Sequence, residues 1–279
     1  MILVETKTEL QKKLFEFNAG GKIGFVPTMG ALHAGHLSLV EKAISDNSVV
    51  VVSIFVNPTQ FNDPNDLKRY PRNLDADLKL LESTGCNLVF APEPKEIYPE
   101  PDTRKFNFGK LETVMEGKHR PGHFNGVAQV VSKLFEIIKP DNAYFGLKDF
   151  QQLAIIKNMA EQLKLPVNIV PCPIVREGNG LAMSSRNELL TKEERENASL
   201  IYKTLKEAKK QYRRKSVKEL ADWIRQNINN NPFLTVEYVE IVNDKTLQPV
   251  ETWNEECAEI ACVAVFCGKV RLIDNIFLN

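Results

Sequence analysis

The chain is organised around the stretch Phe25-Val26-Pro27-Thr28-Met29-Gly30-Ala31-Leu32-His33-Ala34-Gly35-His36, which separates an apolar run ending at Val26 from an amphipathic run beginning at Leu37. This order predicts a strand, a tight turn and a helix. The first turn of such a helix has free N–H groups and the positive end of the helix dipole, and both favour a phosphate. Gly30 and Gly35 allow the backbone to approach a ligand closely.

Two histidines distinguish this loop from an ordinary glycine turn. His33 and His36 lie three residues apart in a chain with only 4 histidines. The loop matches neither G-x-G-x-x-G nor the P-loop pattern with its lysine. We interpret it as a nucleotide loop in which two imidazoles hold a triphosphate. Zinc is the alternative, because His33/His36 and His119/His123 both have ligand-like separations, although no glutamate follows the first histidine as in H-E-x-x-H.

The composition excludes several classes of protein. The 279 residues include 36 basic and 36 acidic side chains, and 43% are hydrophobic. This balance is typical of a globular protein, and it argues against nucleic acid as a partner. The 5 cysteines form no C-x-x-C pair, and no apolar run reaches the roughly 18 residues that span a bilayer. We expect a cytoplasmic protein without a membrane contact.

The order of apolar runs predicts an α/β fold with two domains. Buried-strand runs alternate with amphipathic stretches up to about residue 175, which is typical of a Rossmann-like, doubly wound parallel sheet. Charged helices over 191–212 and 217–229 follow, and then three strands without intervening helices. We therefore predict a Rossmann-like domain over residues 1–185. Residues 186–279 should form a smaller C-terminal α+β domain with helices and a small antiparallel sheet.

Polar segments follow several of the predicted strands. Asn57 to Phe61 comes after the strand predicted at 49–56, and Lys148-Asp149 comes after the strand at 143–146. A second glycine-bearing loop, Glu177 to Asn187, follows the next strand. Open α/β sheets bind ligands beyond the carboxyl ends of their strands, so these segments are well placed for a ligand.

Six blocks of sequence occur in the order known from one enzyme family. They are Pro27 to His36, Ser53 to Phe61, Arg120-Pro121-Gly122-His123-Phe124, Tyr144 to Gln152, Met183-Ser184-Ser185-Arg186-Asn187 and Arg271-Leu272-Ile273-Asp274-Asn275. The chain resembles the pantoate–β-alanine ligases (pantothenate synthetases) of the His-x-Gly-His nucleotidyltransferase group over nearly its whole length. Two positions depart from the pattern: Leu147 stands where many relatives have glutamate, and Ala76 separates Asp75 from Asp77 where relatives tend to have an acidic pair.

The resemblance implies an activity. It is the ATP-dependent condensation of (R)-pantoate with β-alanine to pantothenate, AMP and diphosphate, through a bound pantoyl-adenylate. The resemblance also implies Mg²⁺, a homodimer, and binding of nucleotide and pantoate by the domain over 1–185.

The resemblance assigns site residues when it is carried over position by position. Catalytic roles fall on His33, His36, Lys148 and Arg186, with His36 as proton donor and the two cations against the phosphates. Gln60 and Gln152 would bind pantoate, and Gln60 would also bind β-alanine. Asn57 is either a helper of this site or a turn residue before Pro58. The ATP-binding residues would be Met29, Gly30, Ala31, Leu32, His33, Ala34, Gly35, His36, Gly146, Leu147, Lys148, Asp149, Val175, Met183, Ser184, Ser185 and Arg186.

Two other functions remain open at this point. One is a nucleotidyltransferase with another substrate, against which the Gln60 and Gln152 blocks speak. The other is a non-catalytic nucleotide sensor, against which the joint presence of His36, Lys148 and Arg186 argues.

Overall fold

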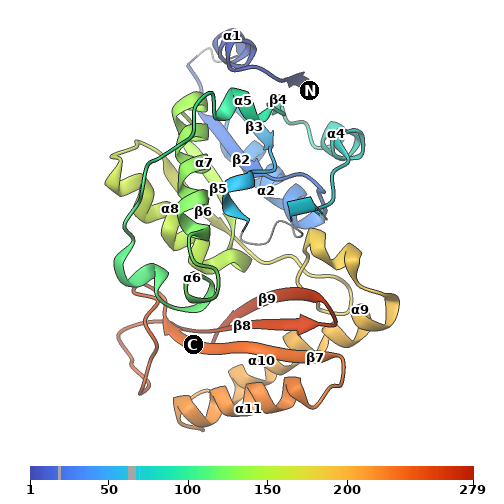
Figure 1. Ribbon diagram of the computed structural model, residues 1–279, viewed down its shortest axis with the longest axis vertical. Helices are drawn as coiled ribbons and strands as arrows, with labels where there is room; N and C mark the ends of the chain where they lie inside the picture. Colours follow the sequence, from blue (N-terminus) through green and yellow to red (C-terminus); the bar gives the residue numbers. More distant parts are fainter. Residues whose placement is uncertain (18–19, 62–66, 69) are drawn as a thin grey trace. The chain divides into compact units, whose positions relative to one another are not determined.

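A computed structural model describes residues 1–17, 20–61, 67–68 and 70–279 of the chain (Figure 1). The chain forms two units. Unit 1 comprises Met1–Phe108, Arg120–Leu147 and Gln152–Pro173, and unit 2 comprises Gly109–His119, Lys148–Gln151 and Ile174–Asn279. The boundary between the domains expected over 1–185 and 186–279 stays a prediction.

Unit 1 is built on a six-stranded sheet with the order β1-β4-β3-β2-β5-β6. All of its strand pairs are parallel, so the predicted doubly wound parallel sheet is confirmed. The long apolar runs of the inner strands are buried, as expected for a sheet covered on both faces. Its strands are β1 (Ile2–Val4), β2 (Ile23–Thr28), β3 (Val49–Ile54), β4 (Leu88–Phe90), β5 (Asn142–Gly146) and β6 (Asn168–Cys172).

Helices cover both faces of this sheet (Figure 1). Val26 of β2 lies in a buried cluster with Leu39 of α2 and Leu81 of α4. The next residue back along the strand, Phe25, points to the other face, where its ring meets that of Phe135 in α7 at 6.1 Å. The helices of this part are α1 (Lys7–Phe17), α2 (Ala34–Asp46), α4 (Leu74–Glu82), α5 (Pro94–Ile97), α7 (His123–Ile138) and α8 (Phe150–Gln162).

The chain changes direction across the sheet at β2. Strands β3 and β4 lie on one side of β2, whereas β5 and β6 lie on the other. The carboxyl ends of β3, β2 and β5 are therefore neighbours at one edge, on either side of the topological switch point. Open α/β sheets bind their ligands at this position.

Unit 2 contains a three-stranded antiparallel sheet with the order β7-β8-β9. Its core includes Leu205 of α10, Ile224 of α11 and Val263 of β8. The predicted antiparallel part with accompanying helices is thus confirmed. Its elements are α6 (Met115–His119), α9 (Lys192–Ala198), α10 (Leu200–Gln211), α11 (Val217–Asn229), β7 (Leu234–Asn243), β8 (Glu259–Cys267) and β9 (Val270–Phe277).

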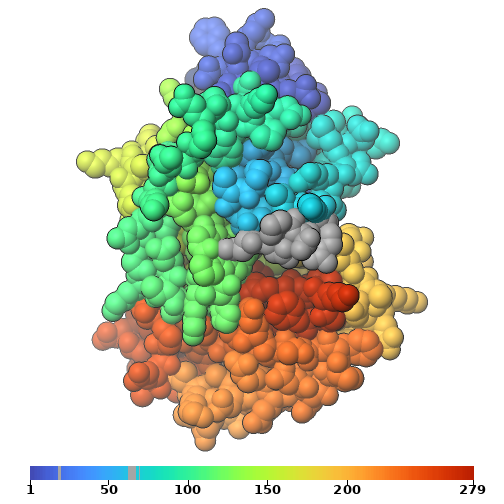
Figure 2. Space-filling view, viewed as in Figure 1, coloured from blue at the N-terminus to red at the C-terminus, as the bar shows by residue number. Residues whose placement is uncertain are grey.

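The single helix expected over 191–212 is wrong, because α9 and α10 meet at Ser199. The N–H group of Ser199 donates to the carbonyl of Glu196, a tighter bond than the α-helical one, and this local tightening separates the two helices. The proline-rich residues from Pro92 to Arg104 run over the surface of unit 1, drawn in green in Figure 2, and contain the one-turn helix α5.

Within the described ranges, no helix combines the length and the apolar character needed to cross a bilayer. All five cysteines carry free thiols.

Candidate active site

The two loop histidines form a cap at the start of α2. Strand β2 ends at Thr28, and His33 is the N-cap residue of α2. Nδ1 of His33 accepts a hydrogen bond from the N–H of Gly35 at 3.1 Å, and Nδ1 of His36 accepts one from the N–H of His33 at 3.3 Å. This is a capping box, which Ser or Thr with Glu or Gln usually forms. The predicted strand, turn and helix are confirmed.

This arrangement decides which ring nitrogen carries the proton. Because both Nδ1 atoms accept hydrogen bonds, the neutral rings of His33 and His36 hold their protons on Nε2. The ring centroids lie 4.1 Å apart, with the planes inclined by 36°. The first turn of α2 contains no acidic residue. Two Nε2–H donors therefore stand at a positive helix end that no carboxylate of that turn compensates.

Asp77 of α4 holds the turn before α2. Its carboxylate accepts hydrogen bonds from the N–H groups of Ala31 (2.9 Å) and Leu32 (2.7 Å). Gly30 has φ +81°, and a Cβ there would lie 2.9 Å from Oδ2 of Asp77. Glycine is thus required by the turn and by Asp77. Burial raises the pKa of Asp77, and the two N–H groups oppose that rise.

The backbone amides of the loop are already used. The N–H groups of Gly30, Ala31, Leu32, His33 and Gly35 each donate within the protein. In the first turn of α2, the expectation of a free amide is therefore wrong for Gly35. The imidazole Nε2–H groups are side-chain donors of this loop of a kind that suits an anion.

Gln60, in the turn after β3, has a defined amide orientation. Its Oε1 accepts from Nδ2 of Asn57 at 3.3 Å, and its Nε2 donates to Sδ of Met29 at 2.8 Å. Asn57 is buried, also donates to the carbonyl of Gly126 (3.0 Å), and accepts from the hydroxyl of Tyr98 (2.9 Å). Asn57 thereby caps the turn and also fixes Gln60, so its two sequence interpretations are compatible.

His123 supports the same turn from α7. Its Nδ1 lies 2.7 Å from the carbonyl oxygen of Gln60. A Cβ at Gly126 would overlap the carbonyl of Thr59, so glycine allows α7 to approach the turn. In unit 2, by contrast, His119 stacks on Tyr238 with ring centroids 5.3 Å apart. Among the residues that the structure describes, no group of three His, Cys, Asp or Glu side chains is arranged to hold a metal ion.

Three neighbouring strands of unit 1 thus carry candidate residues at one edge. Gln60 follows β3, His33 and His36 follow β2, and Gln152 lies in the first turn of α8 after β5. The sequence placed Gln60 and the two histidines beyond predicted strands, and the sheet order makes the three strands adjacent.

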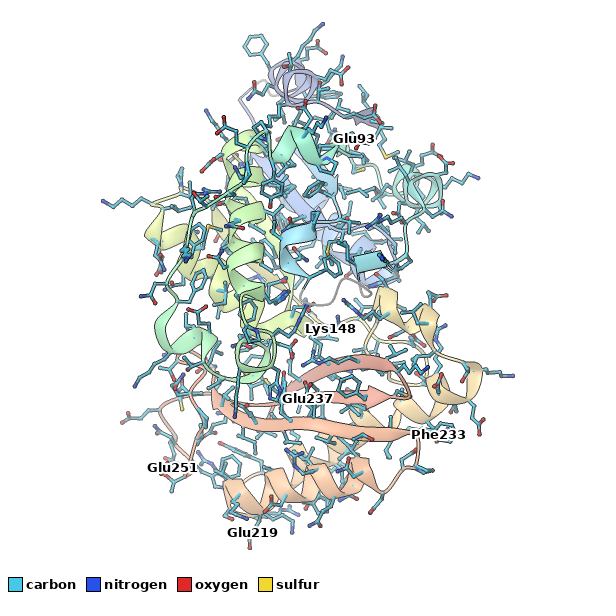
Figure 3. All side chains as sticks on the ribbon, in the orientation of Figure 1. Glu93, Lys148, Glu219, Phe233, Glu237 and Glu251 are labelled. Carbon is cyan, nitrogen blue, oxygen red and sulfur yellow. The ribbon has the colours of Figure 1, made fainter. Side chains whose placement is uncertain are left out.

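Among the other predicted site residues, Gly146 and Leu147 belong to unit 1, whereas Lys148, Asp149, Val175 and the segment from Met183 to Arg186 belong to unit 2. Lys148 is half-buried, with Nζ 3.5 Å from Oδ2 of Asp149, and is labelled in Figure 3. The N–H of Met183 donates to the carbonyl of Val175 at 3.0 Å, which joins two predicted ATP-binding segments. The hydroxyl of Ser184 accepts from the N–H of Arg186 at 3.3 Å and caps the short 3₁₀ helix that follows.

Comparison with known proteins gives the family. The chain matches the model of the family Pantoate-beta-alanine ligase over residues 2–277. The chain belongs to this family. A pantothenate synthetase from Bacteroides fragilis (strain YCH46) is 56% identical over 277 residues, which cover 99% of this chain and 98% of that protein.

Solved structures agree with this assignment. The pantothenate synthetase of Thermus thermophilus is 42% identical with a TM-score of 0.93, covering 100% of this chain and 99% of that one. A Francisella tularensis pantoate–β-alanine ligase, in complex with β-γ ATP and β-alanine, is 38% identical with a TM-score of 0.84, covering 100% and 98%. The chain is thus an enzyme, a ligase of pantothenate biosynthesis that joins pantoate to β-alanine, and the sensor and the unrelated transferase are excluded.

Proposed function

We propose that the enzyme activates (R)-pantoate with ATP as pantoyl-adenylate, and that β-alanine then attacks the activated carbonyl to give pantothenate and AMP. The carboxylate of pantoate would attack the α-phosphorus and release diphosphate. The amine of β-alanine would then form the amide bond and release AMP.

The observation that carries this proposal is the histidine pair at the start of α2. His33 and His36 direct Nε2–H donors from a helix end without an acidic residue in its first turn, at the switch point of the sheet. Negative charge grows on diphosphate as it leaves, and donors oriented in advance stabilise such charge most strongly. We assign the proton-donor role to His36.

The cations of unit 2 complete the assignment. Lys148 would contact phosphate oxygens as a point charge and Arg186 as a planar fork. Backbone groups near Val175 would contact the adenine. The remaining ATP contacts are proposed for the segments Met29–His36, Gly146–Asp149 and Met183–Arg186.

Gln60 suits pantoate because its amide has a fixed orientation. Asn57 occupies the oxygen side of that amide, so the NH₂ group is directed toward the segment of Met29. A neutral donor of this kind binds a hydroxyl or carboxylate oxygen without adding charge. We propose that Gln152 binds pantoate as well and that Gln60 also binds β-alanine.

A covalent acyl-enzyme is disfavoured by the state of the thiols. Burial raises the pKa of Cys86, Cys172, Cys262 and Cys267, which lowers their thiolate fraction and their reactivity as nucleophiles. Activation of pantoate as pantoyl-adenylate requires no nucleophilic residue of the enzyme.

Mg²⁺ fits this site as a companion of the nucleotide. Asp77 already serves the loop amides, and Asp75 is exposed. Mg²⁺ is commonly bound by substrate phosphates with only one or two carboxylates. Bound in this way, it would neutralise part of the phosphate charge.

The homodimer and the cytoplasmic location also remain proposals. Light scattering tests the homodimer, and cell fractionation tests the location.

An isotope-exchange experiment tests the reaction. The enzyme with Mg²⁺, ATP, pantoate and labelled diphosphate, but without β-alanine, should exchange label into ATP. Exchange should require pantoate, and adding β-alanine should release AMP. Release of ADP and phosphate would mean that the acid is activated as an acyl phosphate, and the roles given to His33, His36, Lys148 and Arg186 would then be wrong.

A further inference from the structure

The block Arg271 to Asn275 has no role in the reaction described above, although it is one of the six matching blocks. It lies in β9, where side chains alternate between the faces of the sheet. Val270 and Leu272 belong to the core with α10 and α11. Arg271 and Asn275 point to the opposite face. Figure 3 shows Lys148 on this face, across the sheet from α11.

Asn275 holds the backbone of Lys148. It is 4% exposed, and its Nδ2 donates to the carbonyl oxygen of Lys148 at 2.9 Å. Two residues further along the same face, the ring of Phe277 meets the ring of Phe150 edge-on at 5.8 Å. Strand β9 therefore contacts the chain at two points, one on either side of Asp149: the 3₁₀ turn that contains Lys148 and the first residue of α8.

Asp274 holds the second segment, on the other face of β9. It is 4% exposed, and its two oxygens accept hydrogen bonds from Nη1 (2.6 Å) and Nη2 (3.0 Å) of Arg176. The guanidinium also donates to the carbonyl of Gly180 at 3.2 Å and lies 3.6 Å from the ring centroid of Tyr202. Arg176 follows Val175 directly, so this fork fixes the backbone that is proposed to contact adenine.

Further contacts connect Arg176 with the segment of Arg186. Arg176 pairs with Ala182 in an antiparallel bridge, which brings the chain back to Met183 and the following Ser184. Asn187 donates to the carbonyl of Ala182 at 3.0 Å and to Glu177 at 2.7 Å. Polar contacts thus continue from Asp274 to the turn that carries Arg186.

We propose that Asp274 and Asn275 are positioning residues that keep the Lys148 segment and the segment from Val175 to Arg186 in one fixed arrangement for the nucleotide. This inference rests on the ATP contacts of the proposed function. A buried ion pair is a poor means of gaining stability, because apolar residues of equal size often serve as well. Its hydrogen bonds are directional, however, and they fix the geometry of what they join.

Two variants and one control test this proposal. Asn275→Leu removes the donor at similar size, and Asp274→Asn removes the charge. Tyr212→Phe is the control, because it deletes a side-chain hydrogen bond of unit 2, to Glu259, that touches neither segment. Pantoate-dependent exchange is measured over a range of ATP and of pantoate, with thermal melting of each protein.

We expect kcat/KM for ATP to fall about tenfold to a hundredfold in both variants, as small misplacements of reacting groups do. The KM for pantoate should stay near that of the wild type, since Gln60 and Gln152 are untouched. Tyr212→Phe should melt earlier yet keep its kcat/KM for ATP. Variants that only melt earlier, or a control with an equal kinetic loss, would overturn the proposal.

The outcome separates this inference from the proposed function. A wild-type enzyme without pantoate-dependent exchange would refute the proposed function. Calorimetric titration with ATP would then decide the positioning alone: weaker binding by Asn275→Leu and Asp274→Asn supports it, and unchanged affinity overturns it.

Discussion

The starts of α2 and α11 have the same hydrogen-bond arrangement but are built from different residues. In α11 the N–H of Glu219 donates to Oγ of Ser216 at 3.3 Å, and the N–H of Ser216 donates to Oε2 of Glu219 at 2.8 Å. In α2 the same box is made by His33 and His36. The carboxylate of Glu219 also interacts favourably with the positive end of the helix dipole. In contrast, α2 has no acidic residue in its first turn.

The difference separates what a helix needs from what a ligand needs. Serine and glutamate would cap α2 well, and glutamate would add a favourable charge. Histidines cap the helix without adding a negative charge to its first turn. The pair His33 and His36 therefore has a structural role at the Nδ1 atoms and a proposed chemical role at the Nε2 atoms of the same rings, and suitable variants separate the two.

The largest expected effect comes from His36. We expect His36→Asn and His36→Ala each to lower turnover in the exchange assay about 10²- to 10⁴-fold, as loss of a general acid does. His36→Ala should also lose about 1 kcal/mol of stability, because it removes the Nδ1 that accepts a hydrogen bond from the N–H of His33. His36→Asn should keep its stability, because the Oδ1 of asparagine can accept that hydrogen bond instead. Kinetics and chemical denaturation measure the two effects. Near-normal turnover in a folded His36→Asn protein would remove the proton-donor role.

A second prediction concerns Lys148. It tests whether the two imidazoles stabilise the phosphate charge without help from this cation. We expect Lys148→Ala to lower turnover about 10²- to 10³-fold, as loss of one group that stabilises developing charge does. Its melting temperature should hardly change, since the contact to Asp149 at 3.5 Å is weak. Lys218→Ala is the matched control, because it removes an exposed ion pair with Asp222 in the same unit. Equal activity of the two variants would contradict the role of Lys148.

The sequence predicted the parts of this comparison that have local signals. Apolar runs located the strands, and the amphipathic run beginning at Leu37 predicted α2. His-x-Gly-His has the same spacing as Ser-x-x-Glu, so the cap of α2 could also have been predicted, although the histidines were interpreted as a phosphate site with zinc as the alternative. The break at Ser199 has no such signal, because neither glycine nor proline stands there and Ala198 and Leu200 on either side are good helix formers.

Contacts between residues that lie far apart in the chain could not be predicted from the sequence. Asp77 is 46 residues from Ala31, and in the sequence it stood out only as one of the two carboxylates beside Ala76. Asn275 is 127 residues from Lys148. Whether such side chains meet depends on the order of strands and the packing of helices, which periodicity does not specify. The candidate residues were therefore predictable from motifs, whereas the groups that hold them were not.

A third prediction concerns a variant in which α2 has the usual capping box of serine and glutamate. The double variant His33→Ser/His36→Glu should be at least as stable as the wild type, because the new carboxylate favours the helix end. Its affinity for ATP should fall more than about tenfold, because a carboxylate would repel phosphates at short range. His33→Ser/His36→Gln is the control, since it keeps the box without the charge. If both double variants bind ATP as the wild type does, the start of α2 does not contact phosphate.

The smallest effect is expected at α11, where the box has only a structural role. We expect Ser216→Ala to lower the free energy of unfolding by about 0.5–2 kcal/mol at neutral pH and to leave ATP-dependent exchange unchanged. The N–H and hydroxyl of Ser216 lower the pKa of Glu219. A carboxylate with a depressed pKa stabilises the fold above its unfolded pKa, and this stabilisation is lost as the pH falls through its folded pKa. The difference in stability between wild type and Ser216→Ala should therefore shrink in acid, as urea denaturation from pH 7 to pH 3 would measure. A difference that stays constant over this range would mean that the carboxylate of Glu219 contributes nothing to the cap, and a loss of exchange activity in Ser216→Ala would mean that the two helix starts are not separate in function.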